Sequence, residues 1–146
     1  MKKLMMIAVM VLSVVFGASA RDEYSHDLNT LPPAARTLLK SGFKAGLSHI
    51  KIDRELGKIK DYTVILTDGS EIEFDNKGNW KDIEVSYGKS VPASFVPTGV
   101  TEFVKKNHKG AKIVGIEKNR HGYEVELSSG VEIIFDSNGA FKKYDR

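Results

Sequence analysis

The feature that most constrains the fold of this chain is an internal repeat. Residues 62–81 align without a gap on residues 123–142, at an offset of 61. Ten of the twenty positions are identical, namely Tyr62/Tyr123, Val64/Val125, Leu66/Leu127, Gly69/Gly130, Glu71/Glu132, Ile72/Ile133, Phe74/Phe135, Asp75/Asp136, Gly78/Gly139 and Lys81/Lys142. Farther upstream, Leu31-Pro32 aligns with Val96-Pro97 at an offset of 65. Self-similarity at a fixed period is typical of a duplicated structural unit, so we expect two tandem units.

Each unit has the pattern of one helix followed by antiparallel strands. Pro32 and Pro33 suit the first turn of a helix, where a missing N–H costs nothing. Apolar residues then recur at helical spacing over 31–39 and again over 97–104. Alternating apolar residues predict strands beginning at Tyr62 and at Ile72, together with their repeats, and further strands are expected around 49–52 and 112–114. The sequence therefore predicts an α+β chain of two units, each with one helix and four strands.

The turns between strands fix the expected register. A three-residue turn over 67–69 sets Val64 opposite Ile72, whereas a two-residue turn would place an acid on the core face. The same rule applied to 76–78 brings Trp80 beside Phe74. Each such turn needs a residue with positive φ, which glycine adopts without strain. We expect four structural turn glycines: Gly69, Gly78, Gly130 and Gly139.

The N-terminal segment is typical of an export signal. Lys2 and Lys3 precede an apolar run over 4–16, and Ala18-Ser19-Ala20 supplies a signal-peptidase site, so cleavage is expected near Ala20. An uncleaved membrane anchor is the alternative, although the run is shorter than the roughly 20 residues of a spanning helix. We expect the mature protein in the periplasm or outside the cell, with no membrane insertion after cleavage. The expected organisation is signal peptide 1–20, N-terminal lead-in 21–30, repeat 31–87, linker 88–95 and repeat 96–146.

Charge and residue chemistry narrow the function classes. Removing residues 1–20 takes away two lysines and no acid, so the net charge falls from +3 to +1, and nucleic acid is not an expected partner. The chain has no cysteine, and its four histidines lack metal-ligand spacing. Residues 75–79 resemble the start of a calcium loop but lack its full ligand set, so a hairpin turn is the better interpretation. No catalytic motif is present, and we expect neither an enzyme nor a cofactor.

The sheet face turned away from the helices is the candidate binding surface. Acids and scattered apolar residues interleave along it, which is typical of a protein-recognition face and equally of an ordinary solvated face. If the strand alternation continues past Trp80, its members are Ile65, Glu71, Glu73, Lys81, Ile83, Val85, Tyr87, Glu124, Glu126, Glu132, Ile134 and Tyr144.

Two motifs of the first repeat carry a family resemblance. Leu-Pro-x-Ala-Ala is followed by Tyr-x-Val-x-Leu-x-Asp-Gly-x-Glu-Ile-x-Phe-Asp-x-x-Gly-x-Trp-Lys over 62–81; the second repeat departs at Ser129 and Phe141. With the leader, this pattern resembles the secreted PepSY-like, beta-lactamase-inhibitor-like proteins. The resemblance implies a fold similar to beta-lactamase inhibitory protein, in which two units join into one continuous curved sheet with the helices on one face. Related PepSY modules are thought to bind or restrain peptidases, but no functional residue transfers.

These observations favour a non-catalytic secreted module that recognises another, unidentified periplasmic or surface protein through the exposed sheet face. Its expected anchors are Ile65, Tyr87 and Tyr144, and inhibition of an enzyme such as a peptidase is one form the recognition could take. The alternatives are a carrier of a small ligand or cation between the units, and a hydrolase without a recognisable motif that uses Glu71 and Glu132. The sequence predicts no particular oligomeric state.

Overall fold

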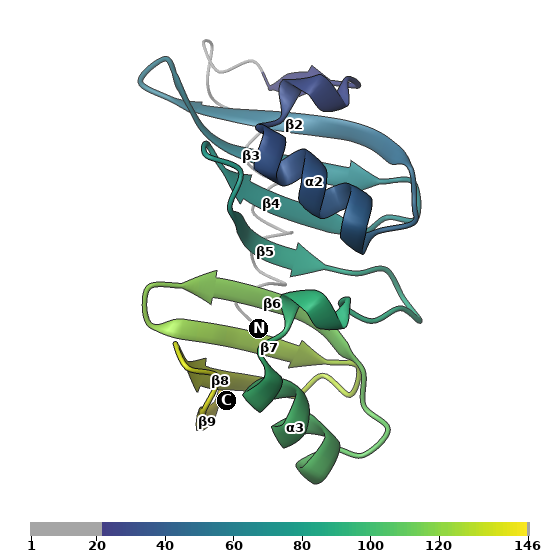
Figure 1. Cartoon of the computed structure of the whole chain (residues 1–146), viewed down its shortest axis with the longest axis vertical. Helices are drawn as coiled ribbons and strands as arrows, with labels where there is room; N and C mark the ends of the chain where they lie inside the picture. Colours follow the sequence, from purple (N-terminus) through teal and green to yellow (C-terminus); the bar gives the residue numbers. More distant parts are fainter. Residues whose placement is uncertain (1–21, 146) are drawn as a thin grey trace.

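The computed structural model describes residues 22–145, so the expected signal peptide 1–20 lies outside the described residues. The described residues form one nine-stranded antiparallel sheet in which every strand pairs with the next one along the sequence (Figure 1). The elements are β1 (Glu23–Ser25), η1 (Leu28–Thr30), α2 (Pro33–Gly42), β2 (Leu47–Glu55), β3 (Lys58–Leu66), β4 (Glu71–Asp75), β5 (Trp80–Glu84), η2 (Ala93–Phe95), α3 (Thr98–Asn107), β6 (Ile113–Asn119), β7 (Gly122–Leu127), β8 (Glu132–Asp136) and β9 (Phe141–Asp145). The α+β class is confirmed.

Helices α2 and α3 lie on the same face of the sheet, α2 over the first half and α3 over the second (Figure 1). α2 has Pro33 at its first position and buries Ala35 and Leu39. α3 follows Pro97 and buries Val100 and Val104. We call this the helix face and the opposite side the outer face.

Close approach of α3 to the last hairpin requires glycine. A Cβ on Gly99 would lie 2.6 Å from the carbonyl oxygen of Gly139, a distance that real Cβ atoms do not show. The start of the helix therefore contacts the turn backbone directly.

A single row of apolar residues crosses the sheet on the helix face. Seven directly opposed residues, each from a different strand, make up this central row: Ile50, Val64, Ile72, Ile83, Ile116, Val125 and Ile133. None of them is more than 1% exposed. The hydrophobic core consequently runs without a break from one half of the chain into the other.

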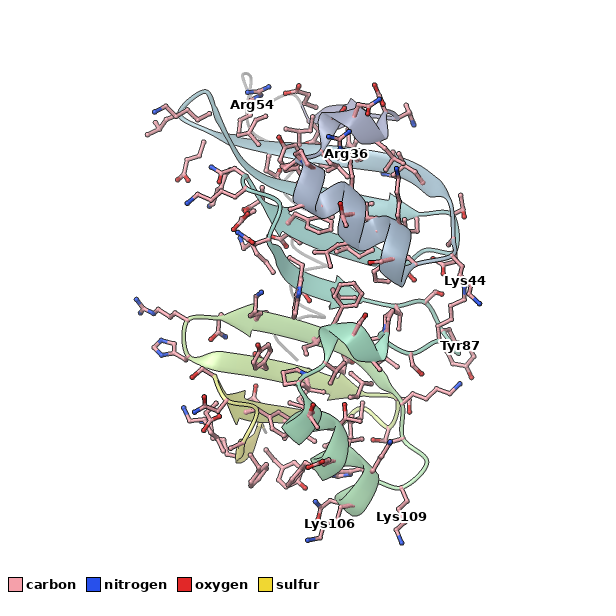
Figure 2. The ribbon with its side chains drawn as sticks, in the orientation of Figure 1. Arg36, Lys44, Arg54, Tyr87, Lys106 and Lys109 are labelled. Carbon is pink, nitrogen blue, oxygen red and sulfur yellow. The ribbon has the colours of Figure 1, made fainter. Side chains whose placement is uncertain are left out.

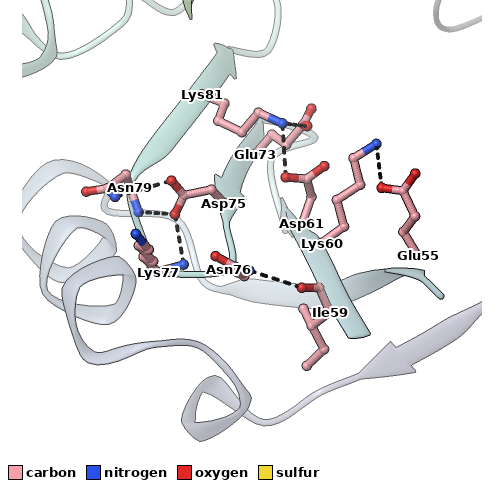
Figure 3. A network of polar contacts seen from close by, with 10 residues as sticks. All are labelled: Glu55, Ile59, Lys60, Asp61, Glu73, Asp75, Asn76, Lys77, Asn79 and Lys81. Carbon is pink, nitrogen blue, oxygen red and sulfur yellow. Dashed lines mark hydrogen bonds and ion pairs between the residues drawn. The ribbon is translucent and has the colours of Figure 1, made fainter. Parts of the chain in front are cut away.

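The expected hairpin geometry is confirmed in both halves. Val64 pairs with Ile72 and Tyr62 with Phe74, and the same pairs recur at the repeat offset in β7 and β8. The four turn glycines have φ between 83° and 91°. Asp75 Oδ1 accepts hydrogen bonds from the backbone N–H groups of Lys77 and Asn79, so this carboxylate stabilises the expected hairpin turn (Figure 3).

The expected alternation past Trp80 is wrong, because a β-bulge interrupts it. Phe74 pairs with Trp80 but Glu73 pairs with Asp82, so Lys81 is an extra residue in β5. One extra residue reverses which face the following side chains occupy. Ile83 therefore lies in the central row on the helix face. The same shift between Ile134 and Phe135 in the β8–β9 pair turns Tyr144 to the helix face.

Two segments expected to lie outside the repeats, the lead-in and the linker, also contribute to the fold. The lead-in 21–30 contains β1, which pairs with β2 and carries an ion pair of 2.7 Å between Glu23 and Arg54. The linker 88–95 contributes the buried side chains of Val91 and Phe95. Within residues 22–145, no helix is both long enough and apolar enough to cross a membrane.

The two halves meet at a seam built around Trp80. Its ring lies 6.2 Å from Phe95 and 6.5 Å from Tyr123, and the Lys118 ammonium lies 4.4 Å from its centroid. The backbone N–H of Val85 donates to the carbonyl of Val114 at 2.9 Å, which extends the β5–β6 pairing.

An ion pair between Lys89 and Asp68 links the linker to the first half. The Lys89 ammonium donates to Asp68 Oδ2 at 2.7 Å, and the backbone N–H of Ser70 donates to Asp68 Oδ1 at 2.9 Å. The hydrogen bond from Lys89, followed by that from Ser70, lowers the pKa of Asp68 to about 2. A lowered folded-state pKa stabilises the fold above the unfolded value near 3.9, and this contribution is lost as pH falls from about 4 towards 2.

We predict that Asp68→Asn reduces the free energy of unfolding at pH 7 by about 0.5–1 kcal/mol, the range for a partly exposed ion pair. The difference from the wild type should shrink steadily between pH 4 and pH 2.5. Urea denaturation across this range measures it, with Lys89→Met as the control that removes the same pair. A difference that stays constant with pH would contradict the assignment.

Candidate binding surface on the outer face

Two rows of directly opposed residues cross the outer face, and no described helix or strand packs on it (Figure 1). The first row runs through Glu73, Asp82, Glu117, Glu124, Ile134 and Lys143. The second row runs through Ile65, Glu71, Glu84, Gly115, Glu126, Glu132 and Asp145. The two adjacent rows thus contain nine acids, the ninth being Asp145 at the end of the second row.

Acids in these rows directly face acids on the neighbouring strand. Such like-charge pairs include Glu71 with Glu84, Glu117 with Glu124, and Glu132 with Asp145. Directly opposed like charges destabilise a sheet. The arrangement concentrates negative potential on one surface, which attracts cationic groups.

Lysine balances the acids in the first half of the sheet. Lys81 Nζ lies 2.9 Å from Asp61 and 3.3 Å from Glu73 (Figure 3). Burial raises the pKa of Glu73, and Lys81 offsets only part of that effect. Burial acts to lower the pKa of Lys81, but the two acids outweigh it and the net pKa is raised. The bulge that displaces Lys81 is therefore what brings its ammonium to these carboxylates.

The second half lacks this arrangement. The repeat alignment places Gly122 and Ile134 at the positions of Asp61 and Glu73, so neither acid recurs. Acids stand instead at Glu124 and Glu126, where the first half has Thr63 and Ile65. The negative charge of the second half is consequently concentrated on β7 and its neighbours.

Three carboxylates of the second half come close together. Glu124, Glu132 and Asp145 each offer an oxygen atom, and the three atoms lie within 4.8 Å of one another. Burial, the neighbouring charge of Glu117 and a hydrogen bond with Asp145 raise the pKa of Glu124. Carboxylate oxygens in such a group are the ligand type that calcium prefers. We call these three residues the carboxylate triad.

Eight of the twelve residues expected on the outer face lie there, and four do not. Those on the outer face are Ile65, Glu71, Glu73, Lys81, Glu124, Glu126, Glu132 and Ile134. Ile83 is fully buried in the central row, and Val85 is partly buried against the core. Tyr87 projects from the loop after β5 and is fully exposed (Figure 2). Tyr144 lies on the helix face, and the bulge in β9 explains its displacement.

Tyr87 borders a hollow beside the linker, and Glu126 of the outer face also lines this hollow. The hollow has a volume of about 480 Å³ and is lined by residues that include Val85, Lys112 and Leu127. The Lys112 ammonium donates to the carbonyl of Gly88 at 2.8 Å across it. The linker therefore shapes one wall of a cavity at the junction of the two halves.

Sequence reasoning missed four acids of the outer face: Asp82, Glu84, Glu117 and Asp145. Three of them follow a bulge, which shifts the side-chain alternation by one residue. The fourth, Glu117, lies in the part of β6 beyond the short segment that periodicity predicted. One signal in the sequence could have indicated two of these acids. Asp145 aligns with Glu84 in the repeat, so an acid ends both strands.

Glu71 and Glu132 do not form a catalytic carboxylate pair. They lie on β4 and β8 in the same row, with three strands between them. At about 4.8 Å per strand they are about 19 Å apart. Paired glycosidase carboxylates are separated by at most about 9.5 Å.

Comparison with known proteins places this chain in a family. Residues 60–143 match the family described as "Putative beta-lactamase-inhibitor-like, PepSY-like". This match covers more than half of the chain, so the chain belongs to the PepSY-like family. Among curated proteins, none matches it.

Three solved structures with the same fold come from Bacteroides. A "putative periplasmic protein of unknown function" from Bacteroides vulgatus is 40% identical, with a TM-score of 0.79 over 86% of this chain and 100% of that chain. A second B. vulgatus periplasmic protein, of the DUF2874 family, is 34% identical, with a TM-score of 0.78 over 89% and 100%. A "putative calcium-regulated periplasmic protein" from Bacteroides thetaiotaomicron is 29% identical, with a TM-score of 0.78 over 86% and 97%.

We predict that Glu124→Gln raises the melting temperature at pH 7. Because the pKa of Glu124 is raised, its ionised form disfavours the folded state above that pKa, and the cost disappears as pH falls through it. The gain should therefore shrink at acidic pH, as measured by thermal unfolding at pH 7 and pH 4. Glu126→Gln, on the same strand and face, is the matched control. An equal gain in both variants would show a general charge effect and contradict a specific role for Glu124.

Proposed function

We propose that this protein is a non-catalytic periplasmic binding module, exported by cleavage near Ala20, that recognises another protein through its outer face. The supporting observation is the pair of acidic rows on a sheet face against which no described element packs. One face of the sheet is used for folding, so the other is available for recognition. The family description is consistent with an inhibitory form of this function, in which the partner is an enzyme such as a peptidase.

The charge of the outer face defines the partner that would fit it. Ile65 and Ile134 offer apolar contacts at the two ends of an acidic surface that spans β4 to β8. A partner with lysine or arginine between two small apolar patches would complement this pattern. Tyr87 and Tyr144 are not among the anchors of this proposal, because both lie off the outer face.

We infer that the two halves descend from a tandem duplication and have diverged in function. The paired strands recur at an offset of 61, whereas the network of Lys81, Asp61 and Glu73 does not. The first half would then contribute mainly a charge-balanced surface, and the second half the charge that attracts the partner.

Charge reversal tests the proposed surface. Glu126→Lys replaces an acid that faces Glu132, so it removes a like-charge pair and should not weaken the fold. We expect it to reduce retention of the periplasmic partner, captured by the mature protein, at least about tenfold, and to lessen the dependence of capture on salt. Glu102→Lys, an exposed reversal on α3, is the control with the same change in net charge. Equal losses in both variants, or no loss in either, would overturn the proposal.

A second candidate function is cation binding at the carboxylate triad. The triad supplies three oxygen ligands, and a relative with the same fold is described as calcium-regulated. A bound divalent cation would relieve the repulsion among Glu124, Glu132 and Asp145. The cation would then stabilise the second half of the sheet and change the charge offered to a partner.

Calcium titration separates this candidate from the first. We expect calcium to raise the melting temperature of the wild type in a saturable manner, and Glu132→Gln to abolish most of that increase. Glu71→Gln is the matched control, because Glu71 occupies the corresponding position in the first half, outside the triad. If both variants respond to calcium as the wild type does, the triad is not a calcium site.

A further inference from the structure

We propose that the chain forms a twofold symmetric homodimer in which β9 pairs antiparallel with β9 of a second copy. β9 is the last strand of the sheet. One edge of β9 pairs with β8, and no strand of residues 22–145 pairs with its other edge (Figure 1). An unpaired edge is a template for another strand. The partner strand and the register of pairing can be inferred from the first half, where the corresponding edge of β5 pairs with β6.

The β5–β6 junction is the internal example of such pairing. Asp82, Ile83 and Glu84 of β5 pair with Glu117, Ile116 and Gly115 of β6, so three residue pairs join the two halves. In the second repeat, the positions of these β5 residues are taken by Lys143, Tyr144 and Asp145, which pair with β8 as the β5 residues pair with β4. β9 therefore presents an edge of the same form, without the strand that covers β5.

Backbone geometry sets the register at Tyr144. Val85 donates its N–H towards β6, and backbone groups in a strand point to the same edge every second residue. The N–H and C=O of Ile83 therefore also point towards β6. By correspondence, those of Tyr144 point to the free edge of β9. A twofold axis at this residue gives two equal hydrogen bonds between the copies.

The charges of β9 match in this register alone. With Tyr144 opposite Tyr144 of the second copy, each Lys143 faces Asp145 of the other copy. Opposite charges directly across a ladder stabilise pairing. Moving the twofold axis by one residue, from Tyr144 to Lys143, would instead set Lys143 against Lys143 of the second copy. Asp145 also gains a cation opposite the side where it faces Glu132. Lysines on an edge strand disfavour indiscriminate pairing, so the same residues select a second copy.

The apolar surface also continues in this direction. Tyr144 pairs with Ile133 and thus extends the central row, but it is 38% exposed whereas the other members are at most 1% exposed. Its ring lies beside those of Phe103 and Phe141, and its hydroxyl lies 2.9 Å from His108 Nε2. A second Tyr144 across the axis would cover the exposed end of the row. The opposite edge, β1, has only three residues and offers no comparable surface.

Charge exchange tests the pairing by sedimentation equilibrium of the mature protein. The wild type should show a concentration-dependent monomer–dimer equilibrium. Lys143→Asp alone and Asp145→Lys alone should each raise the dimer dissociation constant roughly tenfold, since each turns two attractive pairs into repulsive ones. The double variant K143D/D145K should restore the dimer. An equimolar mixture of the two single variants should also dimerise, because their edges are complementary.

A cysteine crosslink tests the register independently. The chain has no cysteine, so Tyr144→Cys introduces a single thiol. Hydrogen-bonded residues across an antiparallel pair have Cα atoms about 5.5 Å apart, within the range of a disulfide. We expect mild oxidation to give a covalent dimer, whereas the exposed control Tyr87→Cys should not crosslink in this way. A monomeric mass at all concentrations, with no preferential crosslink at position 144, would overturn the proposal and leave the edge to a strand of another protein.

Discussion

The central row of seven buried β-branched residues holds both halves of the chain in one sheet. Burying each of these side chains contributes about 1.5–3 kcal/mol, whereas each like-charge pair on the outer face opposes folding by at most about 1 kcal/mol. The helix face can therefore stabilise a sheet whose other face carries mutual repulsion. The fold tolerates an acidic surface because the core continues through Ile83 and Ile116 at the junction of the halves.

The bulges in β5 and β9 determine which side chains lie on each face of the sheet. Without the extra residue in β5, Ile83 would lie among acids on the outer face and the central row would be broken at the junction. The displaced residue, Lys81, becomes the counter-charge of Asp61 and Glu73. In β9 a bulge at the corresponding position turns Tyr144 to the helix face and places Lys143 and Asp145 on the outer face. One local irregularity, used twice, thus links core continuity, surface charge and the form of the free edge.

Much of the fold could be predicted because its signals are local. Turn glycines such as Gly69, alternation from Tyr62 to Leu66 and the prolines before each helix act through neighbouring residues, and the predicted hairpins were confirmed. The candidate site was predicted less well, since face assignment past Trp80 depends on where a bulge falls. The extra residue lies in β5 after the turn, and its position is selected by the packing of Ile83 between Ile72 and Ile116.

The sequence by itself determined the α+β class, the order of helix and strands in each half and the hairpin registers, because periodicity and turn chemistry are properties of short segments. The tertiary structure decided that all nine strands form one sheet, that Ile83 and Tyr144 face the helices, and that Glu124, Glu132 and Asp145 converge. These outcomes depend on contacts between segments far apart in the chain, where the burial of apolar side chains outweighs local alternation and charge.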